Sequence, residues 1–122
     1  MSHILVIEDD AFFSEMLVIM LEQDGHQVAT ANDGANALLV LNNIQPDLII
    51  TDMMMPNMTG AELIQELAKR NNNTPLIMMS GGRLSQSAES NASTDAQLGI
   101  KVTLTKPFSR AELRQAIVGA GN

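Results

Sequence analysis

The chain has 122 residues, enough for one ordinary domain, and we expect a single domain over residues 1–122. Hydrophobic residues make up 45% of it, which excludes a wholly disordered chain, and the lack of cysteine excludes disulfides and thiolate metal sites. A net charge of −7 disfavours direct nucleic-acid binding. No apolar run approaches the ~20 residues of a membrane span, and no signal-peptide pattern is present, so we expect a cytoplasmic protein without membrane contact.

The first half of the chain alternates short apolar runs with longer amphipathic ones. Residues 3–7, rich in β-branched side chains, predict a strand buried on both faces. Residues 11–23 predict a helix, because their large apolar side chains recur on one face at helical spacing. A modest strand over residues 27–31, a helix over 35–43 and a second buried strand over 48–51 follow.

The second half repeats this alternation. Residues 59–70 predict a helix that begins with a capping box, and residues 76–79 predict another buried strand. Residues 81–99 are crowded with serine, asparagine and threonine, and we expect a helix there with long flexible ends. A strand over 101–105 and a helix over 109–118, capped by its first residue, complete the pattern.

Five consecutive strand–helix units predict an α/β fold. Short buried strands alternating with helices form a parallel sheet covered on both faces. Right-handed crossovers leave few topologies, and they favour the flavodoxin-like doubly wound (βα)5 fold with strand order 2-1-3-4-5.

Polar side chains follow four of the predicted strands, at the edge where ligands bind in open parallel sheets. They are Glu8, Asp9 and Asp10 after the first strand, Asp52 after the third, Ser80 after the fourth and Lys106 after the fifth. Two unit charges ~4 Å apart repel by ~4 kcal/mol at an effective dielectric of ~20, so these carboxylates need a proton or a cation between them. Oxygen ligands without histidine or cysteine suit Mg²⁺. With one lysine and one hydroxyl, the crevice is typical of a phosphoryl site.

These motifs resemble the response-regulator receiver domain of bacterial two-component signalling, and are similar to the single-domain chemotaxis regulator. The resemblance covers the whole chain. Its matching elements are Ile4 to Ile7 followed by Glu8-Asp9-Asp10, Asp52 within the run 52–60, Ser80, and Lys106-Pro107-Phe108.

The resemblance implies that Asp52 accepts a phosphoryl group from a histidine kinase or a histidine phosphotransfer protein, and that the domain is not an enzyme in its own right. It implies a Mg²⁺ site, with Mn²⁺ as a possible substitute, whose ligands are Glu8, Asp9, Asp52 and the backbone carbonyl of Met54. Ser80 and Lys106 would contact the phosphoryl oxygens, with Lys106-Pro107 as a cis peptide. The output would be contact with a protein partner that the sequence does not identify.

The sequence departs from the family pattern near the site. The switch position before Lys106, usually an aromatic residue, is Thr103, so no ring can couple to Ser80. Neither Met54 nor Gly82 offers a side chain to orient an attacking water. The stretch from Ser80 to Lys106 is longer than usual and polar.

Several other residues have plainer interpretations. Asp10 is expected to cap the first helix, and of Phe12 and Phe13 one should enter the core while the other stays exposed. His3 and His26 are expected to lie away from the crevice. The methionines near the strand ends are expected to fill the core rather than to bind a soft metal: Met53, Met54, Met55, Met78 and Met79.

Three other functions compete. A phosphatase of the haloacid dehalogenase type needs a second aspartate where Met54 stands, and a nucleotide or flavin module needs a phosphate loop where three acids stand. We reject both. A degenerate receiver that binds partners without phosphorylation remains an alternative, which Thr103 allows and the intact set of acids, serine and lysine opposes.

Overall fold

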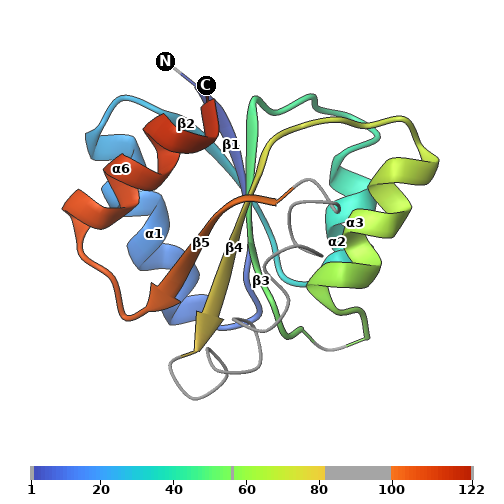
Figure 1. The fold of residues 1–122 in the computed structure, drawn as a ribbon, viewed down its shortest axis with the longest axis horizontal. Coiled ribbons are helices and arrows are strands. Elements are labelled where there is room, and N and C mark those ends of the chain that lie inside the picture. The colour runs from blue at the N-terminus through green and yellow to red at the C-terminus, as the bar shows by residue number, and fades with distance from the viewer. Residues whose placement is uncertain (1, 56, 82–99, 122) are drawn as a thin grey trace.

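The structure is a computed structural model that describes residues 2–55, 57–81 and 100–121. Five parallel strands form one sheet in the order β2-β1-β3-β4-β5, which confirms the predicted fold. The strands are β1 (His3–Ile7), β2 (Gln27–Ala31), β3 (Leu48–Asp52), β4 (Leu76–Gly81) and β5 (Ile100–Lys106). Helices α1 (Ala11–Gln23) and α6 (Arg110–Gly121) lie on one face of the sheet, and α2 (Gly34–Val40) and α3 (Gly60–Lys69) lie on the other (Figure 1). Of residues 81–99, where a helix was expected, Gly81 is the last residue of β4, and residues 82–99 lie outside the described residues.

The apolar run of β1 is buried on both faces because successive strand side chains point to opposite sides of the sheet. Ile4 and Val6 belong to the core cluster beneath α1 and α6, whereas Leu5 and Ile7 belong to the cluster beneath α2 and α3. Burial of each such side chain contributes roughly 1.5–3 kcal/mol. Two cores therefore fix the central strands, and with them the edge at which the polar residues gather.

The helix starts follow the predicted caps. Asp10 Oδ1 accepts hydrogen bonds from the backbone N–H groups of Phe12 and Phe13, at 3.0 and 3.2 Å. Thr59 and Glu62 form the capping box of α3. Ser109 Oγ likewise accepts from the backbone N–H of Glu112 at 3.1 Å, before α6. These bonds satisfy backbone donors that have no partner inside a helix.

Several element boundaries differ from the prediction. Helix α2 ends at Val40 instead of residue 43, and single-turn hydrogen bonds continue to Asn43. Helix α6 runs on to Gly121. Asp52, Ser80 and Lys106 do not follow their strands but belong to them: Asp52 and Lys106 are the last residues of β3 and β5, and Ser80 on β4 pairs with Thr105. Backbone pairing ignores side-chain polarity, so a polar side chain does not end a strand.

Candidate functional site

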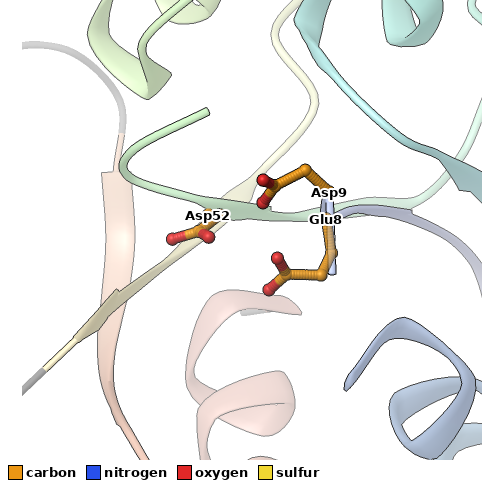
Figure 2. A group of neighbouring side chains, drawn as sticks. All are labelled: Glu8, Asp9 and Asp52. Atoms are coloured by element: carbon orange, nitrogen blue, oxygen red, sulfur yellow. The ribbon is translucent and has the colours of Figure 1, made fainter. Parts of the chain in front are cut away.

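Three carboxylates meet at the carboxyl edge of the sheet. Glu8 and Asp9 directly follow β1, and Asp52 is the last residue of the neighbouring strand β3. One carboxylate oxygen from each lies within 4.8 Å of the others, and the three side chains face a common space (Figure 2). The predicted convergence of these residues is confirmed.

Lys106 reaches this group from the end of β5. Its Nζ lies 2.6 Å from Glu8 Oε1 and 3.3 Å from Asp52 Oδ2. The Glu8 side chain is only 1% exposed, and its other oxygen accepts the backbone N–H of Asp10 at 3.1 Å. The lysine is thus the counter-ion of a buried glutamate and of Asp52 at once.

Burial and neighbouring charges shift the pKa values of both Glu8 and Lys106. Burial raises the pKa of Glu8, and the charge of Asp52 raises it further, although the hydrogen bonds from Lys106 and Asp10 oppose this. Burial lowers the pKa of Lys106, but the hydrogen bond to Glu8 and the charge of Asp52 outweigh it, so this pKa is raised above its usual range. Lys106 therefore stays an ammonium at neutral pH. Burial, by contrast, makes the ionised form of Glu8 energetically unfavourable.

Ser80 lies beside this group on β4, with its side chain buried. Its Oγ has no hydrogen-bond partner among the described residues. A buried hydroxyl without a partner costs roughly 1–3 kcal/mol, so it favours a ligand that brings an acceptor oxygen. The hydroxyl, the ammonium and the carboxylates form one polar edge.

An aromatic pair lies behind Lys106. The ring of Phe13 on α1 has its centroid 4.4 Å from Lys106 Nζ, and the ring of Phe108 meets it edge-on with centroids 5.7 Å apart. Phe13 packs against the core and Phe12 is 72% exposed, as predicted for one of the two. Sequence reasoning missed the contact with Lys106, because only the fold brings α1 and the end of β5 together.

The other described residues considered in the sequence analysis lie outside the carboxylate group. Met53, Met55, Met78 and Met79 pack in the core as expected, but Met54 does not, because it projects from the loop after β3 and is 55% exposed. Thr103 on β5 is exposed, pairs with Met78 and carries no ring. His3 starts β1 and His26 lies in the turn before β2, and neither belongs to the carboxylate group. Gly82 is outside the described residues.

The donor set fits a hard divalent cation. All ligand atoms are carboxylate oxygens, and no histidine or cysteine takes part in the group. Three carboxylates face one ammonium, so the cluster keeps an excess of negative charge that a divalent ion would neutralise. Asp9 is exposed, so an ion can enter from solvent.

Comparisons with known proteins agree with this geometry. The family model of the response regulator receiver domain matches residues 4–118. The transcriptional regulatory protein GlrR of Escherichia coli is 34% identical over 116 residues, 95% of this chain and 25% of GlrR. The DNA-binding response regulator MtrA of Mycobacterium leprae is 32% identical over 114 residues, 90% of this chain and 47% of MtrA. This chain therefore spans less than half the length of these relatives.

Solved structures show the same fold over nearly full length. The receiver domain of the Francisella response regulator 1452 is 32% identical with a TM-score of 0.84, and the match covers 97% of this chain and 95% of that one. The chemotaxis response regulator CheY4 of Vibrio cholerae is 27% identical with a TM-score of 0.85, covering 97% of each chain.

The chain belongs to the response-regulator receiver domains of two-component signalling. Domains of this family are phospho-acceptors rather than enzymes in the usual sense, and they interact with histidine kinases. The Glu8, Asp9 and Asp52 group is consistent with a phospho-acceptor site and with Mg²⁺ binding. Among the described helices, none has the length and apolarity of a membrane span.

Proposed function

We propose that Asp52 is the phosphoryl acceptor of this domain and that the donor is the phosphohistidine of a histidine kinase or a histidine phosphotransfer protein. The observation that carries the proposal is that Asp52 lies beside the carboxylates of Glu8 and Asp9 and has the Lys106 ammonium 3.3 Å from its Oδ2. Glu8, Asp9, Asp52 and the backbone carbonyl of Met54 would hold Mg²⁺, or Mn²⁺ in its place. The bound ion would neutralise negative charge on the transferring group.

The chain's own groups have distinct tasks in this transfer. A carboxylate oxygen of Asp52 forms the new bond to phosphorus while the phosphorus–nitrogen bond of the donor breaks, and the electron pair of that bond stays on the imidazole nitrogen. Lys106 remains protonated and stabilises charge on the phosphoryl oxygens. The unpartnered hydroxyl of Ser80 donates a hydrogen bond to one of them.

Output through a cytoplasmic protein partner is the second part of the proposal. When Ser80 turns toward a phosphoryl oxygen, the end of β4 follows it. Thr103 offers no ring to take a second packed position, so we propose residues 83–99 as the element that changes. Those residues lie outside the described part of the chain, and hydrogen exchange of the phosphorylated and free forms tests them. No gain in protection over residues 83–99 would refute this route.

Intact mass after incubation with a small phosphodonor and Mg²⁺ tests the acceptor. We expect one added phosphoryl group on the wild type and none on Asp52→Asn. Asp47→Asn is the matched control, because Asp47 lies at the opposite end of the sheet, where it accepts the backbone N–H of His3. A phosphorylated Asp52→Asn refutes the assignment. A wild type that never gains the group favours the alternative, a degenerate receiver that binds partners without phosphorylation.

A further inference from the structure

Within the described part of the chain, the Lys106 ammonium contacts two carboxylates and one aromatic ring. Glu8 and Asp52 face it with carboxylates, and the ring of Phe13 lies 4.4 Å away, centroid to Nζ. The face of an aromatic ring carries partial negative charge and attracts a cation within about 6 Å. The Lys106 side chain is 23% exposed, so water weakens this attraction only in part.

We propose that Phe13 is a positioning residue for Lys106: its ring face holds the ammonium at Asp52 by a cation–π contact. This inference rests on the proposed function of Asp52 and adds a residue to that site. The ring is itself held, because it packs against the ring of Phe108 in a T-shaped arrangement with an interplanar angle of 87°. Phe108 follows Lys106 by two residues, so the same segment supplies both the cation and the support for the ring.

The ring does what the carboxylates cannot do. Glu8 and Asp52 are also the groups proposed to bind a cation, so their oxygens are shared between tasks. The ring binds no metal and competes for no oxygen. It therefore attracts the ammonium whether or not a metal ion occupies the carboxylates. Without it, the four-carbon stem of Lys106 can swing toward solvent, and the ammonium spends less time where the phosphoryl oxygens arrive.

The plainer view is that Phe13 only fills the core. It packs against the cluster beneath α1 and α6, so its removal would also cost packing. The two roles differ in what they require of the side chain. Packing requires volume, whereas the cation–π contact requires an electron-rich ring face.

A set of variants at position 13 separates these roles. Phe13→Leu keeps an apolar side chain without a ring, Phe13→Tyr keeps the ring, and phenylalanines carrying progressively more fluorine keep the shape while weakening the negative face. Phe12→Leu is the matched control, since Phe12 is the sequence neighbour and is 72% exposed. The readouts are the rate of phosphorylation by a small phosphodonor at saturating Mg²⁺ and the proton shifts of the Lys106 ε-methylene group.

We expect Phe13→Leu to lower the phosphorylation rate by about three- to tenfold, and successive fluorines to lower it stepwise. Phe13→Tyr and Phe12→Leu should stay near the wild-type rate. The methylene protons should be shifted upfield by the ring in the wild type and in Phe13→Tyr, and not in Phe13→Leu.

An unshifted Lys106 signal in the wild type, or a rate that ignores fluorination, overturns the proposal. If Phe13→Leu does not fold, the fluorinated rings still decide. If the wild type is not phosphorylated at all, the acceptor assignment fails, while the Lys106 shift and its loss on ring removal still report on the contact itself.

Discussion

Two charged clusters flank helix α1, and they have opposite composition. At its N-terminal end, the carboxylates of Glu8, Asp9 and Asp52 lie together, and among the described residues Lys106 forms ion pairs with two of them, Glu8 and Asp52. At its C-terminal end, Asp24 alone accepts two guanidinium groups, with Arg110 Nη2 at 2.6 Å and Arg114 Nη2 at 2.8 Å. The first cluster has too few cations, and the second has cations to spare.

The pKa directions follow this imbalance. The hydrogen bonds from Arg114 and Arg110 hold the pKa of Asp24 well below its usual range, whereas burial raises the pKa of Glu8. Acid therefore affects the two ends oppositely: it removes stabilisation at Asp24 and relieves a cost at Glu8. The Asp24 cluster ties α6 to α1. The cluster of Glu8, Asp9 and Asp52 has an excess of carboxylates, and the nearby Ser80 hydroxyl has no hydrogen-bond partner among the described residues, so this end of α1 is suited to receive a ligand.

Removal of the Lys106 ammonium from the cluster of Glu8, Asp9 and Asp52 should have the largest effect. We expect Lys106→Met to lose about 2–3 kcal/mol of unfolding free energy at neutral pH, because it leaves a buried carboxylate without a partner. The pKa of Glu8 is already raised in the folded state, so lowering the pH protonates it and restores part of the loss. Urea unfolding at about pH 7 and pH 5 measures both.

Lys69→Met is the control for that change, since the Lys69 side chain is 76% exposed and its ion-pair partner among the described residues is Glu66, at 3.7 Å. It should change stability little at either pH. Equal losses of unfolding free energy in Lys106→Met and Lys69→Met would show that Lys106 does not stabilise the buried carboxylate.

Addition of the missing charge should stabilise the same cluster. At tenfold excess over its dissociation constant, Mg²⁺ should add about 1.4 kcal/mol to the unfolding free energy. Asp9→Asn removes one proposed ligand and should abolish most of this gain. Thermal unfolding with and without Mg²⁺ measures it, and an undiminished gain in Asp9→Asn would exclude Asp9 as a ligand.

Neutralising Asp52 should also raise the unfolding free energy, but by less than Mg²⁺ does. Carboxylate oxygens within 4.8 Å repel by ~3 kcal/mol at an effective dielectric of ~20, and Lys106 offsets much of this. We expect Asp52→Asn to gain about 1 kcal/mol of stability in the presence of EDTA. Asp47→Asn, which has no such neighbours in the carboxylate group, should gain none. A destabilised Asp52→Asn would mean that Lys106 already compensates the cluster fully.

The fold and the site carboxylates could be predicted because their signals are local. The runs at 3–7 and 48–51 are continuous and apolar, and the carboxyl ends of parallel strands meet whatever lies between them. Glu8, Asp9 and Asp52 therefore converge as expected. The end of α2 was less predictable, since Leu41 to Asn43 keep turn-like hydrogen bonds that no side chain distinguishes from helix.

Contacts that helix side chains make with other elements could not be predicted. Phe13 and Lys106 are far apart in sequence, and nothing in either local pattern indicates that a ring faces the ammonium. The Asp24 cluster was missed for the same reason, because Arg110 and Arg114 lie on α6, far from Asp24 in sequence. Met54 was expected inside because methionine is usually buried, whereas the loop after β3 turns it outward.

The smallest expected effect lies at the Asp24 cluster, and it has a distinct pH dependence. Asp24→Asn removes the carboxylate that accepts from Arg110 and Arg114, so it should lower the urea midpoint at neutral pH. Because the folded pKa of Asp24 is depressed, its stabilisation is fully present above the ordinary aspartate pKa and is lost as the pH falls from there through the depressed folded pKa. The wild type and Asp24→Asn should therefore converge in acid. A gap that persists unchanged down to about pH 3 would show that Asp24 acts through geometry at the end of α1 rather than through its charge.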